Sequence, residues 1–399
     1  MNRTCVHTVA FALVLCTALV GPIAAQDAIT PGELRVEPPT LICAGFQWFG
    51  SGDANRNAEV SVAYRKLSEK GWEDALPLYR LDKEEEGLPL LAGSVMDLEE
   101  DTEYEFRLTL IDPDGVEGHD GKLVKTVTLR TWKEPMAPEG DVEVRHVYPA
   151  GYKGEKQEPA FFTIKGALKG QPRGGWGGLR DPAGPGTVLL LHGGLYKANP
   201  TDYRNAYAQH FTGSLYLDGY SGEEGRPLVI KAAGDGEAII DGAGAHVLFD
   251  LVGAEHVYFE ALTIRNCGIA FQLSDMPHRD PSRHITLKNC TVKDIRVVVY
   301  GGHPGNRRVY VADNRFHGRQ KAVIGSWGDF TSAAALGLAG RGHVVAYNSC
   351  YDFFDFYNTW GFYTGGAPFG RADHKDNSAI DVYNNYMERT SDNAVGMQQ

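Results

Sequence analysis

Basic side chains are concentrated in one stretch of the sequence, where residues 279–321 contain ten Lys and Arg against three Asp. Such a group can attract an anionic partner, and it can equally be a set of solvated turns. It suits β-elimination on a uronic-acid polymer, because that reaction needs a cation to neutralise the sugar carboxylate and a base to remove the neighbouring proton. The expected base is Lys321, the expected neutralising groups are Arg319 and Arg296, and the expected proton donor is Tyr300 or His303. A surface position is the alternative for Lys321.

Further candidates for sugar contacts lie in the same irregular part of the chain. Aromatic rings stack on the faces of sugar rings, while amide and charged groups bind hydroxyls and carboxylates. The Trp side chains can equally be packed in the interior. The expected substrate-binding residues are Gln272, Arg296, Trp327, Asp329, Trp360 and Tyr363.

Acidic residues offer two other chemistries. Hydrolysis of a glycosidic bond uses a pair of carboxylates, and oxygen ligands hold Ca²⁺. No two aspartates are adjacent, and the nearest pairs are Asp352 with Asp355 in "YDFFDF" and Asp373 with Asp376 in "RADHKDN". We expect Asp373 and Asp376 as ligands if Ca²⁺ is bound, with solvated loop acids as the alternative. The sequence requires no other cofactor.

A repeated pattern must position these residues. Similar stretches, such as "HITLKNCTVKDI", begin at residues 256, 284, 308, 343 and 379, at intervals of 28, 24, 35 and 36 residues. This period, with paired apolar residues in each copy, predicts a β solenoid whose coils bury their apolar faces against each other. The expected inward pairs are Val257/Phe259, Ile285/Leu287, Val309/Val311, Val344/Ala346 and Ile380/Val382. A column of corner residues, expected to bond from coil to coil, is Ala261, Asn289, Asp313, Asn348 and Asn384.

Residues 140–399 resemble the right-handed parallel β-helix of the pectate-lyase-like superfamily. The resemblance rests on the repeat, on "TVLLLHGGLYKA" (187–198) and on "PLVIKAAGDGEAIIDG" (227–242). It implies a groove lined by the first strand of each coil, and a Lys or Arg base, with Ca²⁺ in some members. The fuller catalytic motifs of the family are missing, so the likeness carries no activity by itself. The expected first strands are "HVLFDL", "CGIAFQLS", "IRVVVYGGH", "KAVIGSWG", "TWGFYTGG" and "DNAVGM".

Residues 33–133 predict a separate sandwich of short strands, since β-rich runs such as "EYEFRLTLI" alternate with turns. This region resembles a fibronectin type III domain. The resemblance rests on Trp48, in an early strand, and on "DLEEDTEYEFRL" (97–108). It implies a buried Leu98 and a tyrosine corner at Tyr104. The sandwich is the acidic part of the chain, because residues 26–135 contain 12 Lys and Arg against 23 Asp and Glu.

The N-terminus has the features of a cleaved signal peptide, residues 1–25, with Arg3 before an apolar run and "IAA" before Gln26. We therefore expect a secreted or periplasmic protein without a membrane span. Cys43, Cys267, Cys290 and Cys350 remain after cleavage, either as buried thiols or in a disulfide, and their spacing does not suit zinc. The final "SDNAVGMQQ" resembles the start of another coil, so we expect either an incomplete sequence or a short tail that covers the open end of the solenoid.

Together these observations predict an all-β protein with a sandwich followed by a right-handed parallel β-helix. The expected partner is an extracellular, anionic polysaccharide, not a nucleic acid. A lyase is the favoured function. A non-catalytic carbohydrate-binding or adhesive protein and a glycoside hydrolase are the alternatives.

Overall fold

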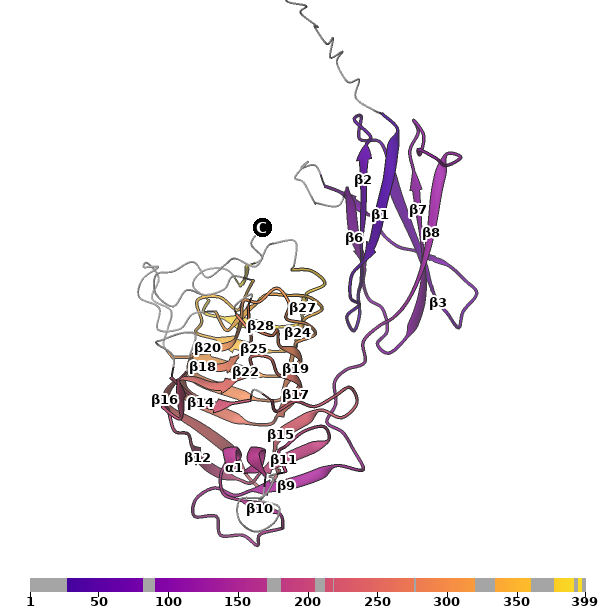
Figure 1. The fold of residues 1–399 in the computed structure, drawn as a ribbon. Coiled ribbons are helices and arrows are strands. Elements are labelled where there is room, and N and C mark those ends of the chain that lie inside the picture. Colours follow the sequence, from indigo (N-terminus) through magenta and orange to yellow (C-terminus); the bar gives the residue numbers. More distant parts are fainter. Residues whose placement is uncertain are drawn as a thin grey trace, which may run out of the picture.

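The chain forms two β domains, a sandwich followed by a parallel solenoid (Figure 1). The computed structural model describes residues 27–81, 90–170, 181–204, 212–217, 219–275, 278–319, 334–359, 377–390 and 394–396. The predicted all-β fold is confirmed. Within the described ranges no helix is long and apolar enough to cross a membrane.

Two antiparallel sheets of four strands make the sandwich. Alternating apolar residues of both sheets form its core, as in β7, where Tyr104, Phe106, Leu108 and Leu110 are buried. The first sheet, in spatial order, contains β1 (Ile29–Val36), β2 (Ala44–Gly52), β6 (Leu91–Val95) and β5 (Tyr79–Arg80). The second contains β4 (Glu73–Asp74), β3 (Glu59–Lys66), β7 (Glu103–Ile111) and β8 (Lys122–Arg130).

The three sandwich residues singled out in the sequence lie where they were expected. Trp48 and Leu98 are buried in the core. The hydroxyl of Tyr104 accepts a hydrogen bond from the backbone N–H of Glu99 at 2.9 Å. This bond back to a residue upstream is the tyrosine corner of sandwich domains.

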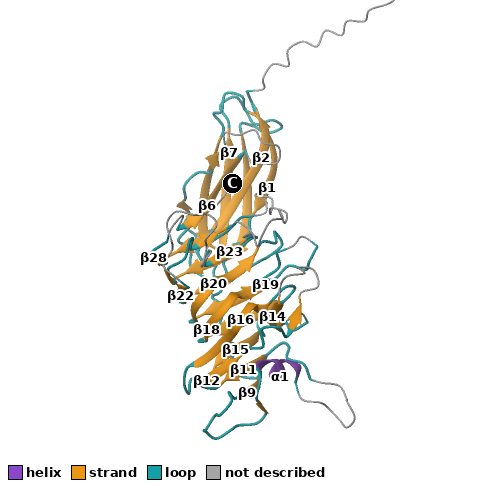
Figure 2. Cartoon of the chain, turned by 90° about the vertical axis from the view of Figure 1, so that its left-hand side faces the viewer, coloured by secondary structure: helices purple, strands orange, loops and turns teal. Residues whose placement is uncertain are grey.

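Parallel strands stack coil on coil in the solenoid (Figure 2). A nine-stranded sheet contains β10 (Ala160–Phe161), β9 (Glu143–Val147), β11 (Thr187–Leu191), β15 (Leu228–Ala232), β17 (Glu255–Glu260), β19 (Arg283–Lys288), β21 (Tyr310–Ala312), β24 (Val344–Ala346) and β27 (Asp381–Tyr383). A twelve-stranded sheet contains β12 (Gly194–Lys197), β13 (Tyr203–Arg204), β14 (Thr212–Tyr216), β16 (Ala238–Asp250), β18 (Thr263–Gln272), β20 (Thr291–Gly301), β22 (Arg315–Gly318), β23 (Leu336–Leu338), β25 (Ser349–Tyr351), β26 (Tyr357–Asn358), β28 (Tyr386–Glu388) and β29 (Val395–Gly396).

The twelve-stranded sheet turns a corner, because β16, β18 and β20 contain left-handed residues at Ala243, Asn266 and Asp294. The parts of β16, β18 and β20 after the corner pair with one another in this order. At one end of the row β16 also pairs with β14, and at the other end β20 also pairs with β23. We call the outer surface of these parts, continued by β23, β26 and β29, the groove face. Its fourth and fifth strands are Leu336–Leu338 and Tyr357–Asn358, whereas the expected "KAVIGSWG" and all of "TWGFYTGG" but Thr359 lie outside the described residues.

The predicted inward pairs are correct in the first three copies and wrong in the fourth. Val345, not Val344 or Ala346, pairs in register with Val311 and lies in the solenoid core. Because side chains alternate along a strand, this shift of one residue turns Val344 and Ala346 to the outer face. His343 takes the inward position instead. It accepts a hydrogen bond from the N–H of Val309 at 3.1 Å, and burial lowers its pKa to about 3.

An asparagine ladder joins three coils, and its rung in the fourth copy, Asn348, is the residue that was predicted for the corner column. Asn314, Asn348 and Asn385 stack inside the corner, and each of the first two donates to the side-chain oxygen of the next at 2.9 Å. Each also donates to a backbone carbonyl of the preceding coil. The exposed corner column beside the ladder has positive φ throughout and consists of Ala261, Asn289, Asp313, Tyr347 and Asn384.

A short helix, α1 (Ile164–Lys169), covers part of the N-terminal end of the solenoid. Thr163 caps it by accepting a hydrogen bond from the N–H of Gly166, and Ile164, Ala167 and Leu168 face the core. The helix does not include the preceding aromatic residues, since Phe161 belongs to β10 and Phe162 is exposed.

The sandwich contacts the outer face of the last coils (Figure 1). Leu41 and Trp132 pack with Tyr310, Val344 and Ala346 in one apolar cluster. Around this cluster, polar contacts cross the interface at short range. They are Thr40 with Asp381, Glu37 with Ser378 and Arg341, and Glu134 with Lys288 and Tyr310.

Candidate functional site on the groove face

Two of the predicted substrate and catalytic residues are neighbours on the groove face. Asp250, Gln272 and Tyr300 occupy equivalent positions on β16, β18 and β20. Since parallel strands lie about 4.8 Å apart, the three side chains form a row across three coils. Gln272 Nε2 donates to the carbonyl of Leu273 at 2.8 Å, and Asp250 Oδ1 accepts from the N–H of Val252 at 3.2 Å.

A second carboxylate joins this row from the loop after β18. Burial, and to a smaller extent the charge of Asp250, raise the pKa of Asp275 to about 6. The charges of Arg279 and His278 act in the opposite direction, as does a backbone hydrogen bond. Burial, and then the charge of Asp275, raise the pKa of Tyr300 above its usual value, so the phenol stays protonated. The row thus combines a carboxyl group that titrates near neutral pH with a hydroxyl donor.

A buried polar network supports the two loops that carry the site. Ser282 Oγ accepts from the N–H of Ser274 at 3.0 Å and donates to the carbonyl of Leu251 at 2.8 Å. Asn306 Oδ1 accepts from the N–H of Ser282, and Asn306 Nδ2 donates to the carbonyl of Ser274, both at 3.0 Å. These bonds fix the loop that contains Asp275 to the turn that contains His303.

His303 lies in the turn after β20 and is buried. Its backbone N–H donates to the carbonyl of Ser274 at 3.0 Å, and its Nδ1 accepts from the N–H of Gly305 at 2.7 Å. With Nδ1 as an acceptor, the neutral ring carries its proton on Nε2. The backbone of His303 is thus held to the loop that contains Asp275, with Nε2 as the ring donor.

The two predicted arginines lie at the other end of the groove strands. Arg319 donates to the carbonyl of Cys267 at 2.6 Å and lies 3.6 Å from Asp294, at the corner. Arg296 directly follows Ile295, the first residue after that corner. Tyr300 is four residues further along β20 than Arg296, which corresponds to about 13 Å of strand. Arg296 and Arg319 are thus brought near each other but not near Tyr300.

The remaining predicted site residues lie outside the described residues, so their roles stay predictions. They are Lys321, Trp327, Asp329, Trp360, Tyr363, Asp373 and Asp376. Within the part of the chain that is described, no group of three or more His, Cys, Asp and Glu could hold a metal ion. The four cysteines are free thiols, and burial raises the pKa values of Cys43, Cys267 and Cys290 to about 12.

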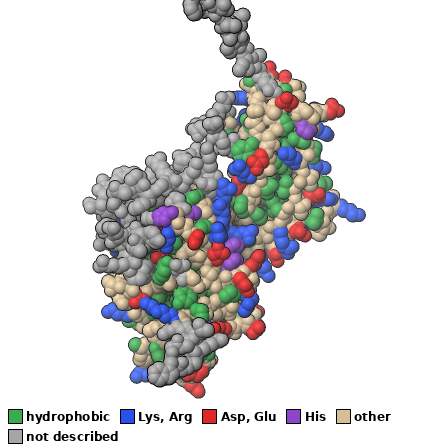
Figure 3. Space-filling view, viewed as in Figure 1, with side chains coloured by type: hydrophobic (Ala, Val, Ile, Leu, Met, Phe, Trp, Pro, Cys, Tyr) green, Lys and Arg blue, Asp and Glu red, His purple; other side chains and the backbone are tan. Residues whose placement is uncertain are grey.

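The basic stretch 279–321 does not form one patch, because each coil wraps once around the solenoid. Lys288 faces the sandwich and contacts Glu134, whereas Arg319 lies at the corner. Three arginines, at equivalent positions of successive coils, do stack at the edge of the nine-stranded sheet near the sandwich, where Figure 3 shows Lys and Arg side chains gathered. They are Arg283, Arg307 and Arg341.

Sequence reasoning missed two groups. Asp250 could have been found by aligning "FD", "FQ" and "VY" at the ends of three groove strands, where each polar residue follows an inward apolar one. The second group is a relay on the first coils, in which Asp235 contacts His192 Nδ1 at 2.7 Å and His192 Nε2 contacts His146 Nδ1 at 3.0 Å. Tyr152 also donates to Asp235 at 2.8 Å.

The relay has electrostatics of its own. Burial alone would raise the pKa of Asp235, but hydrogen bonds from His192, the N–H of Gly193 and Tyr152 outweigh it and bring the pKa to about 2. Burial, and then His192, lower the pKa of His146. The ring of Tyr148 stacks on His192 at 4.2 Å. The relay thus fastens the loop of Tyr152 to the solenoid with an ionised Asp235.

One comparison with a solved structure concerns the sandwich. No protein-family model matches the chain, and no curated protein matches it. Among solved structures, the fibronectin type III domain of human fibronectin type III domain containing protein 3 is similar at 15% identity and a TM-score of 0.18. This match covers 27% of this chain and 89% of that domain.

Proposed function

We propose that this chain cleaves an extracellular polysaccharide at the groove face, with Asp275 as the proton donor. The observation that carries the proposal is the row of Asp250, Gln272 and Tyr300 with the partly buried Asp275 beside it. The substrate class follows from the predicted kinship of residues 140–399 with the pectate-lyase-like superfamily. Action outside the cytoplasm follows from the predicted export of the chain.

The described residues favour hydrolysis. A carboxyl group with a pKa of about 6 keeps its proton in about half of the molecules at about pH 6 and in about a tenth at about pH 7. In the proposed reaction Asp275 donates this proton to the glycosidic oxygen as the bond to the anomeric carbon breaks. Water adds to that carbon and loses its proton to the carboxylate of Asp250. Two carboxylates at one place disfavour a uronate ring there, so the bond cleaved should flank a neutral sugar.

β-Elimination is the alternative, and one observation supports it. The charge of Arg279 acts on Asp275, so a cation that could neutralise a sugar carboxylate is present at the row. The predicted base of this reaction, Lys321, lies outside the described residues. Hydrolysis and elimination give different products, so one experiment separates them.

The test is incubation of the mature protein with a panel of neutral and uronic-acid-containing polysaccharides. Two readouts are taken together, namely new reducing ends and the ultraviolet absorbance of unsaturated sugars. We expect reducing ends without absorbance, and a loss of about 10²–10⁴-fold in rate for Asp275→Asn, the range for removal of a general acid. Absorbance that disappears in Lys321→Ala would establish a lyase with the predicted base.

Asp280→Asn is the matched control, because Asp280 is an exposed acid in the same loop. Its rate should equal that of the wild type. If neither readout rises on any polysaccharide with folded protein, cleavage is refuted, and a pull-down on the same panel then tests carbohydrate binding without catalysis. If cleavage persists in Asp275→Asn, the assignment of the proton donor is refuted.

A further inference from the structure

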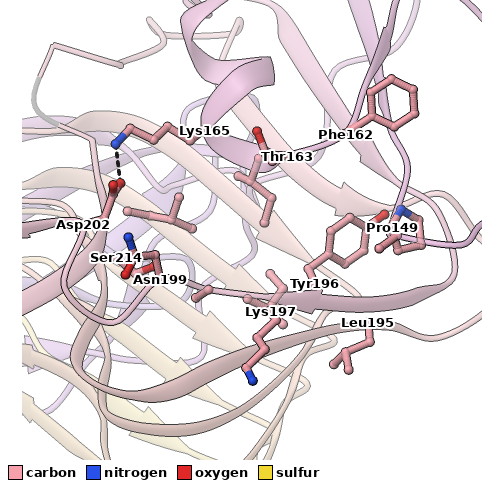
Figure 4. A pocket seen from close by; sticks show the side chains of 15 residues that line it. Pro149, Phe162, Thr163, Lys165, Leu195, Tyr196, Lys197, Asn199, Asp202 and Ser214 are labelled. Carbon is pink, nitrogen blue, oxygen red and sulfur yellow. Dashed lines mark hydrogen bonds and ion pairs between the residues drawn. The ribbon is translucent and has the colours of Figure 1, made fainter.

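A cavity of about 520 Å³ lies at the N-terminal end of the solenoid, between α1 and the strands β12, β14 and β16. It exists because the first coil is incompletely covered. Among the described strands, β12 pairs with β16 alone, and on its outer side β14 meets only the two-residue strand β13. The cap helix α1 closes part of this end, and the space between it and the first coil stays open (Figure 4).

The walls of the cavity combine side chains of the solenoid interior with exposed apolar side chains at its rim, such as Phe162 and Leu195. Leu215 and Ile240 come from the coil, Ile164 comes from α1, and Tyr196 points in from β12, facing Thr163 (Figure 4). The polar atoms of these walls are already bound within the fold. Tyr196 Oη lies 2.7 Å from the carbonyl oxygens of both Val147 and His192, and Thr163 Oγ1 accepts from the N–H of Gly166. The cavity therefore presents mainly carbon surface.

One ion pair and one exposed cation lie beside the cavity. Lys165, on α1, forms an ion pair with Asp202, as Figure 4 shows. Ser214 and Asn199 also line the cavity and are neutral, whereas Lys197 is an exposed cation whose ammonium group points away from Thr163 and Tyr196 in Figure 4. An ionic ligand would have to break the pair or enter an apolar space unpaired, which is costly. A neutral ligand meets neither cost.

We propose that this cavity is a second binding site, for a small neutral molecule with a largely apolar body. Its volume falls within the range of small-molecule sites, and apolar walls with a few polar groups at one side are their usual composition. An apolar space of this size gains little from water, because water would find few partners on its walls. The site is independent of the proposed polysaccharide cleavage.

The proposal can be tested on the intact chain with two fluorescent probes of nearly the same shape. N-phenyl-1-naphthylamine is neutral, and 1-anilinonaphthalene-8-sulfonate carries a sulfonate. We expect saturable binding of one neutral probe per chain and at least about tenfold weaker binding of the sulfonated probe. Equal affinity for both probes, or no saturable binding of the neutral one, would overturn the proposal.

A matched pair of variants locates the site. Ile240 and Ile264 are in-register neighbours that both face the core, but only Ile240 lines the cavity. Ile240→Phe should fill the space, keep the melting temperature within about a degree and weaken probe binding about tenfold. Ile264→Phe should overpack a filled core, lower the melting temperature by several degrees and keep probe binding.

Three outcomes count against the site. Full probe binding in Ile240→Phe would place the probe elsewhere. Loss of stability in Ile240→Phe as large as in Ile264→Phe would show that the space is absent. Loss of probe binding in folded Ile264→Phe would also contradict the location. Asp275→Asn should bind the probe as the wild type does, which separates this test from that of the groove face.

Discussion

On the groove face, the placement that gives a single residue its chemical property can also lower the stability of the fold. Asp275 holds its proton because it is partly withdrawn from water and lies near Asp250. The same placement costs stability whenever the carboxyl group ionises. A residue that destabilises the fold at neutral pH is typical of a functional position.

This cost gives a stability prediction for Asp275→Asn. The folded state binds the proton more tightly than the unfolded chain, with a pKa of about 6 against 3.8. The contribution of Asp275 is therefore fully present below about pH 4 and is lost as the pH rises through about 6. We expect Asp275→Asn to raise the melting temperature at about pH 8 and to lose this gain toward about pH 4. Thermal unfolding across this range, with Asp280→Asn following the wild type, is the measurement.

The sequence was informative about which residue types gather at the site and less so about their distances. Gln272 and Tyr300 were recognised because polar groups that end apolar strands stand out. The separation of Gln272 and Tyr300 from Arg296 and Arg319 was not recognised. It depends on the corner at Asp294, which divides β20 into two parts on different faces of the solenoid. A corner of one left-handed residue leaves little trace in a single sequence.

At the scale of elements, the asparagine ladder holds the coils in register. Asn348 is its central rung, since it bonds to Asn314, to Asn385 and to the carbonyl of Val311. Its position was predicted as a corner residue, because the longer insertion before the fourth copy shifts the alignment by one. The true corner residue there is Tyr347, which breaks the Asn and Asp pattern of its column.

Removing the central rung should be costly. Asn348→Ala leaves the buried N–H of Asn314 and the carbonyl of Val311 without partners, so we expect a loss of about 2–4 kcal/mol in the free energy of unfolding. Asn289→Ala is the control, because Asn289 is exposed at a corner and should cost about 1 kcal/mol or less. Urea unfolding of both variants decides the matter. Equal losses would mean that the side-chain hydrogen bonds of the ladder add no free energy of unfolding beyond the preference of asparagine for the left-handed corner conformation.

At the scale of the whole molecule, the sandwich is fastened to the solenoid. Leu41 and Trp132 bury apolar surface against the outer face of β21 and β24, with polar contacts around them. A fibronectin-like module is often a spacer on a flexible linker. Here its contacts indicate one rigid unit instead.

A rigid unit should unfold as one. We expect a single calorimetric transition for the wild type and two transitions for Leu41→Asp, because a buried charge disrupts the apolar cluster between the domains. Leu76→Asp is the control, since Leu76 is 75% exposed in the sandwich, and it should keep the single transition. Two transitions in the wild type would show that the contact does not couple the domains.

The docking of the sandwich also has a consequence for the order of biosynthesis. The chain leaves the sandwich and enters the solenoid at β9, yet the sandwich contacts residues of β19, β21, β24 and β27. Domains near the N-terminus fold first as a chain emerges. The folded sandwich therefore keeps Leu41 and Trp132 exposed until the late coils have folded and can cover them. The contact between the sandwich and the solenoid can therefore be completed only after β27, the last strand that the sandwich contacts, has been synthesised.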